Sequence, residues 1–87
     1  MRIVNGLQSK HLKFLIGGNN RMRETIALLN KLGHQIITRE FTRKNDGYTV
    51  LYILSVDCIE YTTASCQQKA AREHIRRIVE DEVNARN

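Results

Sequence analysis

Hydrophobic residues recur at helical spacing in one segment of the chain, at Met22, Ile26, Leu28, Leu29 and Leu32. Positions three, four and seven apart fall on one face of an α-helix, so this stripe predicts a helix over Asn20–Leu32. Gly33 follows at the position where helices commonly end in a residue of left-handed conformation. We therefore expect an amphipathic helix that ends in a glycine cap.

Two runs rich in β-branched and aromatic residues come next, Gln35–Arg43 and Tyr48–Val56. The segment 44–47 joins them, and its Asp46-Gly47 pair is a strong signal for a tight hairpin turn. Such a turn predicts the pairs Phe41–Tyr52 and Ile37–Val56 on one side of the hairpin, and Glu40–Ile53 and Thr42–Leu51 on the other. One of the two sides should face the core.

The residues before the amphipathic helix predict a second, shorter helix. Ser9 is a good N-cap for a helix over Lys10–Ile16. The sequence Gly17-Gly18-Asn19-Asn20 should then break that helix, because glycine favours turns and either asparagine can cap the next helix. Helix, tight turn and helix is the expected order.

A long helix is predicted at the other end of the chain, after a polar connector over Cys58–Thr63. Ser65 followed three residues later by Gln68 resembles a capping box, which would open a helix from about 64 to 85. Its narrow stripe consists of Ala71, Ile75, Ile78, Val79, Glu82 and Val83. A helix with such a stripe must cover it, either in the core or against a second copy of the chain.

The length of 87 residues fits one small domain, which we assign to residues 1–87. The longest apolar run, Val50–Leu54, falls far short of the ~20 residues of a membrane-spanning helix. The first residues lack the apolar stretch of ~7–15 residues that is typical of a secretion signal. We therefore expect a cytoplasmic protein without a membrane partner.

Positive charge is concentrated in the first half of the chain. The net charge is +5, and residues 1–44 hold nine Lys or Arg against two Glu, whereas residues 45–87 are slightly acidic. A segregated charge of this kind creates a local positive potential that attracts nucleic acid, and solubility alone does not require it.

The predicted elements within 9–56 resemble, in their order, the small winged helix-turn-helix domains common in bacteria and their phages. The resemblance implies an α+β, winged helix-turn-helix-like fold with two short helices, a β-hairpin wing and a long C-terminal helix. Only eight residues precede Ser9, too few for the helix that normally opens the core of these domains. The C-terminal helix could take that place, or the chain could have another α+β architecture, such as a sheet with helices on one face.

The resemblance and the charge together predict a small regulator that binds double-stranded DNA. Side chains at the start of a recognition helix reach base edges, and here they are Asn19, Asn20, Arg21 and Arg23. The cations expected to hold phosphates are Lys10, Lys13, Lys31, Arg39, Arg43 and Lys44. The last two lie at the predicted wing tip.

The alternative is a protein-interaction module whose hairpin or C-terminal helix docks on a protein partner or, in a homodimer, on a second copy. Small phage-type antagonists of host or defence machines are of this kind. We expect no enzyme, since His11, His34 and His74 lie in different predicted elements and no catalytic spacing appears. Cys58 and Cys66 lack the paired spacing of a zinc site, so we expect free, partly buried thiols and no cofactor.

Overall fold

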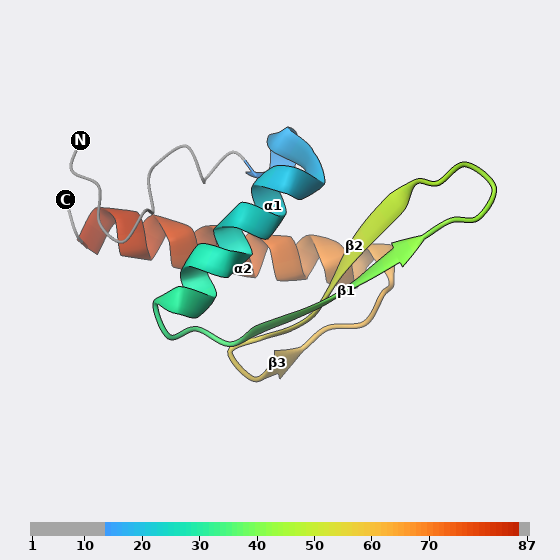
Figure 1. Cartoon of the computed structure of the whole chain (residues 1–87). Coiled ribbons are helices and arrows are strands. Elements are labelled where there is room, and N and C mark those ends of the chain that lie inside the picture. The colour runs from blue at the N-terminus through green and yellow to red at the C-terminus, as the bar shows by residue number, and fades with distance from the viewer. Residues whose placement is uncertain (1–13, 86–87) are drawn as a thin grey trace.

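The computed structural model describes residues 14–85, with the side chains of residues 21–85 (Figure 1). Along this part of the chain the elements are α1 (Phe14–Lys31), β1 (Ile36–Thr42), β2 (Thr49–Val56), β3 (Ile59–Glu60) and α2 (Ser65–Ala85). The strands form an antiparallel sheet in the order β1-β2-β3. The α+β class is therefore confirmed.

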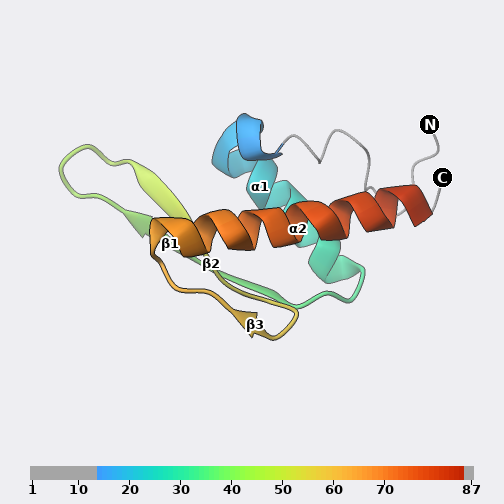
Figure 2. The same ribbon diagram turned by 180° about the vertical axis from the view of Figure 1, so that it is seen from behind.

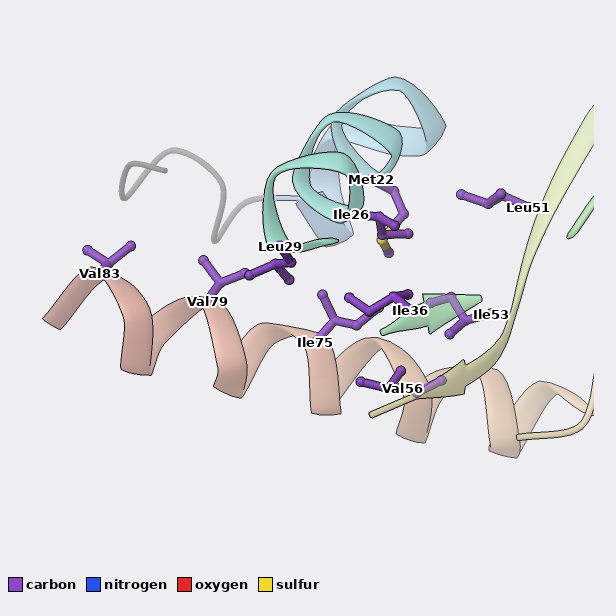
Figure 3. Packing of buried hydrophobic residues seen from close by; sticks show 11 residues of the cluster. Met22, Ile26, Leu29, Ile36, Leu51, Ile53, Val56, Ile75, Val79 and Val83 are labelled. Carbon is purple, nitrogen blue, oxygen red and sulfur yellow. The ribbon is translucent and has the colours of Figure 1, made fainter. Parts of the chain in front are cut away.

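Both helices contribute to one core on a single face of the sheet. Its buried hydrophobic residues are Met22, Ile26, Leu29, Ile36, Leu51, Ile53, Val56, Ala71, Ile75, Val79 and Val83. Figure 3 shows Leu29 of α1 beside Val79 of α2, with Ile36 and Ile75 nearby. The sheet thus has a helix-covered face and an open face, which is one of the two architectures that the sequence left open.

The predicted turn between two short helices is wrong. Gly17, Gly18, Asn19 and Asn20 lie inside α1, which runs unbroken from Phe14 to Lys31. Glycine weakens a helix interior by roughly 0.5–1 kcal/mol relative to alanine, but it can adopt helical dihedral angles, so two glycines do not oblige the chain to turn. Of the short helix predicted over Lys10–Ile16, residues 10–13 lie outside the described residues and the rest belongs to α1.

The predicted end of the helix at Gly33 is confirmed. Gly33 has a φ of 106°, and the N–H of His34 donates to the carbonyl of Leu29 at 3.1 Å. The side chain of Asn30 then ties the helix to β1: its Oδ1 accepts from the N–H of Ile36 at 2.8 Å and its Nδ2 donates to the carbonyl of Ile36 at 3.2 Å. These bonds fix the direction in which the sheet leaves α1.

The hairpin of β1 and β2 is confirmed, but its register differs from the predicted one. Phe41 pairs with Val50 instead of Tyr52, which displaces the strands by two residues. The cause is the connection, because residues 44–47 form the whole loop instead of a tight turn at Asp46-Gly47. The N–H of Arg43 donates to the carbonyl of Tyr48 at 2.9 Å and closes this loop.

A bulge in β2 brings Val56 to the core. Thr38 pairs with Ile53 whereas Ile37 pairs with Ser55, so the register shifts and leaves Leu54 as the extra residue. Because side chains alternate between the two faces of a strand, one extra residue moves all later positions to the opposite face. Val56 therefore pairs with Ile36 on the helix-covered face, and the predicted pair of Ile37 with Val56 is wrong.

The connector predicted after β2 contains a short third strand. Asp57 and Cys58 have φ angles of 47° and 74°, and Val56 pairs with Ile59 on β3. Positive φ at both central residues is typical of the two-residue turn that suits the twist of a hairpin. Aspartate tolerates this conformation, but cysteine seldom adopts it, so the residues at this position do not predict the turn.

The bounds of α2 agree with the predicted helix, but the capping box is wrong. Gln68 points to the sheet: its Oε1 accepts from the N–H of Ile53 at 2.8 Å, and its Nε2 donates to the carbonyls of Ile53 at 2.9 Å and Thr62 at 2.7 Å. The strand β3 pairs with Ser55 and Val56 and does not reach Ile53. The side-chain amide of Gln68 therefore makes the hydrogen bonds to the backbone of Ile53 that a neighbouring strand would make.

The apolar stripe of α2 is used within the molecule. Ala71, Ile75, Val79 and Val83 are all buried in the core. Ile78 is only partly buried beside them. The stripe that suggested a homodimer is thus already covered by the chain itself. No helix within residues 14–85 is long and apolar enough to cross a membrane.

Candidate nucleic-acid interface

The β1–β2 hairpin projects beyond both helices, as the two opposite views agree (Figures 1 and 2). Its loop is held by local bonds: Gly47, with a φ of 71°, donates its N–H to the carbonyl of Arg43 at 2.9 Å. Oδ1 of Asp46 accepts from the N–H of Tyr48 at 3.0 Å. Aspartate and glycine form turns of this kind, and these bonds define the path of the backbone at the hairpin tip.

Two of the predicted phosphate-binding cations lie at this tip. Arg43 pairs with Asp46, with 2.7 Å between Nη2 and Oδ2, and its guanidinium lies 5.0 Å from the centroid of the Tyr48 ring. Its positive charge is thus partly offset by the carboxylate. Lys44, the next residue, is exposed in the loop. Together they give the tip a net positive charge.

A third predicted cation, Arg39, lies on the open face of the sheet. Ile36, Leu51 and Ile53 are buried under the helices, so the alternate residues of both strands point the other way. Between the bulge and the loop, the residues of this open face are Ile37, Arg39, Phe41, Val50 and Tyr52. Arg39 stands directly opposite Tyr52, and Phe41 opposite Val50.

The open face of β1 and β2 carries no acidic side chain between the bulge and the loop. Glu40 belongs to the helix-covered side of β1, where its carboxylate forms an ion pair with Nε of Arg23 on α1. A hydrogen bond to Glu40 raises the pKa of Arg23. This pair neutralises one predicted base-reading residue and separates it from Arg39, which lies on the opposite side of the same strand.

The other predicted site residues do not gather at the hairpin. Arg21 is half-buried on α1, and Lys31 is exposed at the last residue of that helix. Asn19 and Asn20 lie within α1, so they do not mark its beginning. Lys10 and Lys13 lie outside the described residues. Of the predicted site residues, the structure brings together Arg39, Arg43 and Lys44.

The sequence did not single out the aromatic residues of the open face. Phe41 is 62% exposed and Ile37 is 58% exposed, although both are large hydrophobic residues. The sequence did contain a signal for this surface, because β1 has apolar side chains on both of its faces. Ile36 points to one side of the strand, and Ile37 and Phe41 point to the other. One face of such a strand stays uncovered when all helices pack on the other.

His34, Asp57 and Glu82 form a polar cluster at the opposite end of the sheet. Nδ1 of His34 lies 2.8 Å from Oδ2 of Asp57, and its Nε2 lies 3.4 Å from Oε1 of Glu82. Partial burial tends to lower the pKa of His34, but the hydrogen bonds to Asp57 and Glu82 outweigh it and raise the pKa. Asp57 accepts a hydrogen bond from the N–H of Gln35 at 2.8 Å, and this bond lowers the pKa of Asp57. The hydrogen bond with His34 lowers it further.

A second polar pair borders a shallow hollow on α2. The hydroxyl of Tyr61 lies 2.8 Å from Nδ1 of His74, and the hollow is also lined by Ala70, Glu73 and Arg77. Within the described residues, no group of three or more His, Cys, Asp or Glu could hold a metal ion. Both thiols are free and exposed, so the expected partial burial of Cys58 and Cys66 is wrong.

Comparison of the chain with models of protein families, with curated proteins and with solved structures finds no match. The resemblance to winged helix-turn-helix domains therefore stays a prediction. The turn expected between the two helices of a helix-turn-helix is not formed at Gly17 and Gly18, because α1 is continuous through both residues.

Proposed function

We propose that the protein binds nucleic acid and that its β1–β2 hairpin holds the phosphate backbone. The observation that carries this proposal is the placement of Arg39, Arg43 and Lys44 on one projecting element, whose open face carries no acidic residue between the bulge and the loop. Asp46, which pairs with Arg43, is the one acidic residue of the second half of the chain that lies within the hairpin, so the other cations there can approach a polyanion. Each phosphate contact releases a counterion and makes binding sensitive to salt.

The fold changes which residues are assigned to this function. Base reading by Asn19, Asn20, Arg21 and Arg23 was predicted because a recognition helix was expected to begin there. Since Asn19 and Asn20 lie inside α1 and Arg23 is paired with Glu40, we assign no base contacts to these residues. Binding to double-stranded DNA and a regulatory role stay predictions. The hairpin is compatible with binding to a duplex, because the major groove admits a two-stranded β-ribbon.

The test compares hairpin cations with an exposed cation elsewhere. Arg39→Ala and Lys44→Ala each remove one charge from the hairpin, and Lys69→Ala removes one from α2, so all three variants have the same net charge. Binding to labelled oligonucleotides is measured by fluorescence anisotropy at several salt concentrations. We expect the two hairpin variants to bind more weakly and to lower the salt slope by about 1, whereas Lys69→Ala should bind like the parent protein. Equal losses in all three variants would show nonspecific attraction by net charge alone.

The second candidate function is the protein-interaction module, and the exposure of Ile37 and Phe41 favours it. Large apolar side chains that share one face are typical of docking surfaces. This alternative becomes the better account if the parent protein shows no salt-dependent affinity for any oligonucleotide. The C-terminal helix is less suited to that role, because its apolar stripe is buried.

A further inference from the structure

The open face combines exposed aromatic area with positive charge. Phe41 and Tyr52 are diagonal neighbours on β1 and β2, since Phe41 pairs with Val50 and Tyr52 with Arg39. Diagonal neighbours in an antiparallel pair lie about 7–8 Å apart, a distance that long and aromatic side chains can bridge. The two rings and the Arg39 guanidinium therefore occupy adjacent positions on one surface.

We propose that this open face binds single-stranded nucleic acid, with bases stacked on Phe41 and Tyr52 and the backbone held by Arg39. The inference rests on the proposed function and specifies its ligand. In a duplex each base is stacked between its neighbours and shows only its edges in the grooves. A single strand has free base faces, and aromatic side chains of proteins bind them without strong sequence preference.

The aromatic rings of the hairpin differ in how accessible they are to a stacking base. Tyr48 is 57% exposed, but the guanidinium of Arg43 already lies 5.0 Å from its ring centroid. Phe41, at 62% exposed, is the most exposed of the large hydrophobic residues in the described part of the chain. Phe41 is therefore the principal stacking residue, and half-buried Tyr52 is the second.

Charge favours a polyanion over a second copy of the chain as the occupant of this face. Arg39 lies at its centre without an acidic neighbour on the same face of β1 or β2, and Arg43 and Lys44 extend the positive charge to the tip. Two such faces placed against each other would bring like charges together, which costs free energy in an interface. A phosphodiester strand supplies the complementary charge along its whole length.

The experiment separates base stacking from hydrophobic docking by two substitutions at one position. Phe41→Ala removes the ring, and Phe41→Leu keeps a large apolar side chain without a π-face. Ile59→Ala is the matched control, because Ile59 is 53% exposed but lies on β3, away from Phe41. Circular dichroism establishes that each variant is folded. The ligands are a 12-nucleotide oligo-dT, the corresponding oligo-rU and a DNA duplex of equal length.

We expect the parent protein to prefer both single strands to the duplex. Phe41→Ala and Phe41→Leu should each weaken single-strand binding by about five- to 150-fold, the range given by the loss of one stacked base. Ile59→Ala should bind like the parent protein, and the duplex affinity should change little in any of the three variants. The oligo-dT and oligo-rU arms show whether the sugar matters.

The two proposals fail in different ways. If no oligonucleotide binds in a salt-dependent manner, the proposed function itself is wrong. If the hairpin cations matter but duplex and single strand bind equally, and Phe41→Leu binds like the parent, then the protein binds nucleic acid without base stacking and only this inference is overturned. The inference is also overturned if Phe41→Leu keeps the affinity that Phe41→Ala loses, because the contact is then hydrophobic rather than aromatic.

Discussion

At the scale of single residues, a few polar side chains determine how neighbouring segments meet. Asp57 occupies a left-handed position in the turn between β2 and β3, and its two carboxylate oxygens contact the N–H of Gln35 and the ring of His34. Since Gln35 and His34 lie between α1 and β1, this one side chain joins two turns that are distant in the sequence. Its negative charge therefore affects both the turn and the histidine.

The His34–Asp57 pair makes stability depend on pH in a defined window. The raised pKa of His34 means that its contribution is fully present below its unfolded value of about 6.5 and is lost as the pH rises through the folded pKa. The lowered pKa of Asp57 means that its contribution is present above about 3.9 and is lost as the pH falls through the folded pKa. Both groups are charged, and the pair is strongest, between these limits.

Asp57→Asn should lower the pKa of His34, because it removes the charge but keeps an oxygen for the N–H of Gln35 and tolerates the positive φ. The pKa is measured by NMR titration of the His34 ring. The free energy of unfolding should fall by no more than about 1 kcal/mol near pH 5, since both side chains are partly exposed, and the loss should shrink at higher pH. Asp46→Asn, in the distant hairpin loop, is the control, and a His34 pKa unchanged by Asp57→Asn would contradict the assignment.

At the scale of elements, local signals in the sequence predicted the structure well where the conformation is determined locally. The end of α1 at Gly33, the hairpin and the span of α2 follow from periodicity and turn residues. The register of β1 and β2 did not, because the sequence shows neither that the loop takes all four residues of 44–47 nor that a bulge at Leu54 turns Val56 to the core. The unbroken path of α1 through Gly17 was missed for a related reason, since helix propensity is a weak preference that tertiary packing overrides.

The continuity of α1 can be tested at Gly17. In a helix interior, Gly17→Ala should raise the free energy of unfolding by roughly 0.5–1 kcal/mol, because alanine loses less backbone freedom on folding. Urea unfolding followed by circular dichroism measures the change.

Gly33→Ala is the matched control for that substitution. Nothing lies within 4 Å of a Cβ at position 33, but its φ of 106° strains any residue other than glycine. This variant should therefore lose stability while Gly17→Ala gains it. Destabilisation by Gly17→Ala to a similar degree would indicate a turn at Gly17 and would favour the helix-turn-helix interpretation of residues 9–32.

At the scale of the whole molecule, the candidate site exists because both helices pack on the same face of the sheet. The sequence indicated that one face of the hairpin is core, but it could not indicate whether a helix covers the second face as well. Ile37 and Phe41 are as hydrophobic as core residues, and only the tertiary arrangement leaves them exposed. The cations of the hairpin were predicted because charge is visible in the sequence, whereas the aromatic surface beside them depends on the path of α2.

The path of α2 across the sheet depends on Gln68. Its side-chain amide satisfies both the N–H and the carbonyl of Ile53, at 2.8 Å and 2.9 Å, beyond the point where β3 ends. Gln68 is buried, so a substitution leaves these backbone groups without a partner and without access to water. These two hydrogen bonds therefore hold α2 against the middle of β2.

Gln68→Ala should lower the free energy of unfolding by about 1–3 kcal/mol, the cost of leaving buried polar groups unpaired. Gln67→Ala removes the same side chain from the neighbouring, partly exposed position, and it should change stability by no more than about 0.5 kcal/mol. Hydrogen exchange provides the site-specific measurement, because the amide of Ile53 donates to Gln68 and should lose protection before its neighbours in β2. If that amide exchanges equally slowly in both variants, α2 is held on the sheet by its apolar residues alone, and Gln68 does not determine which face of the hairpin stays open.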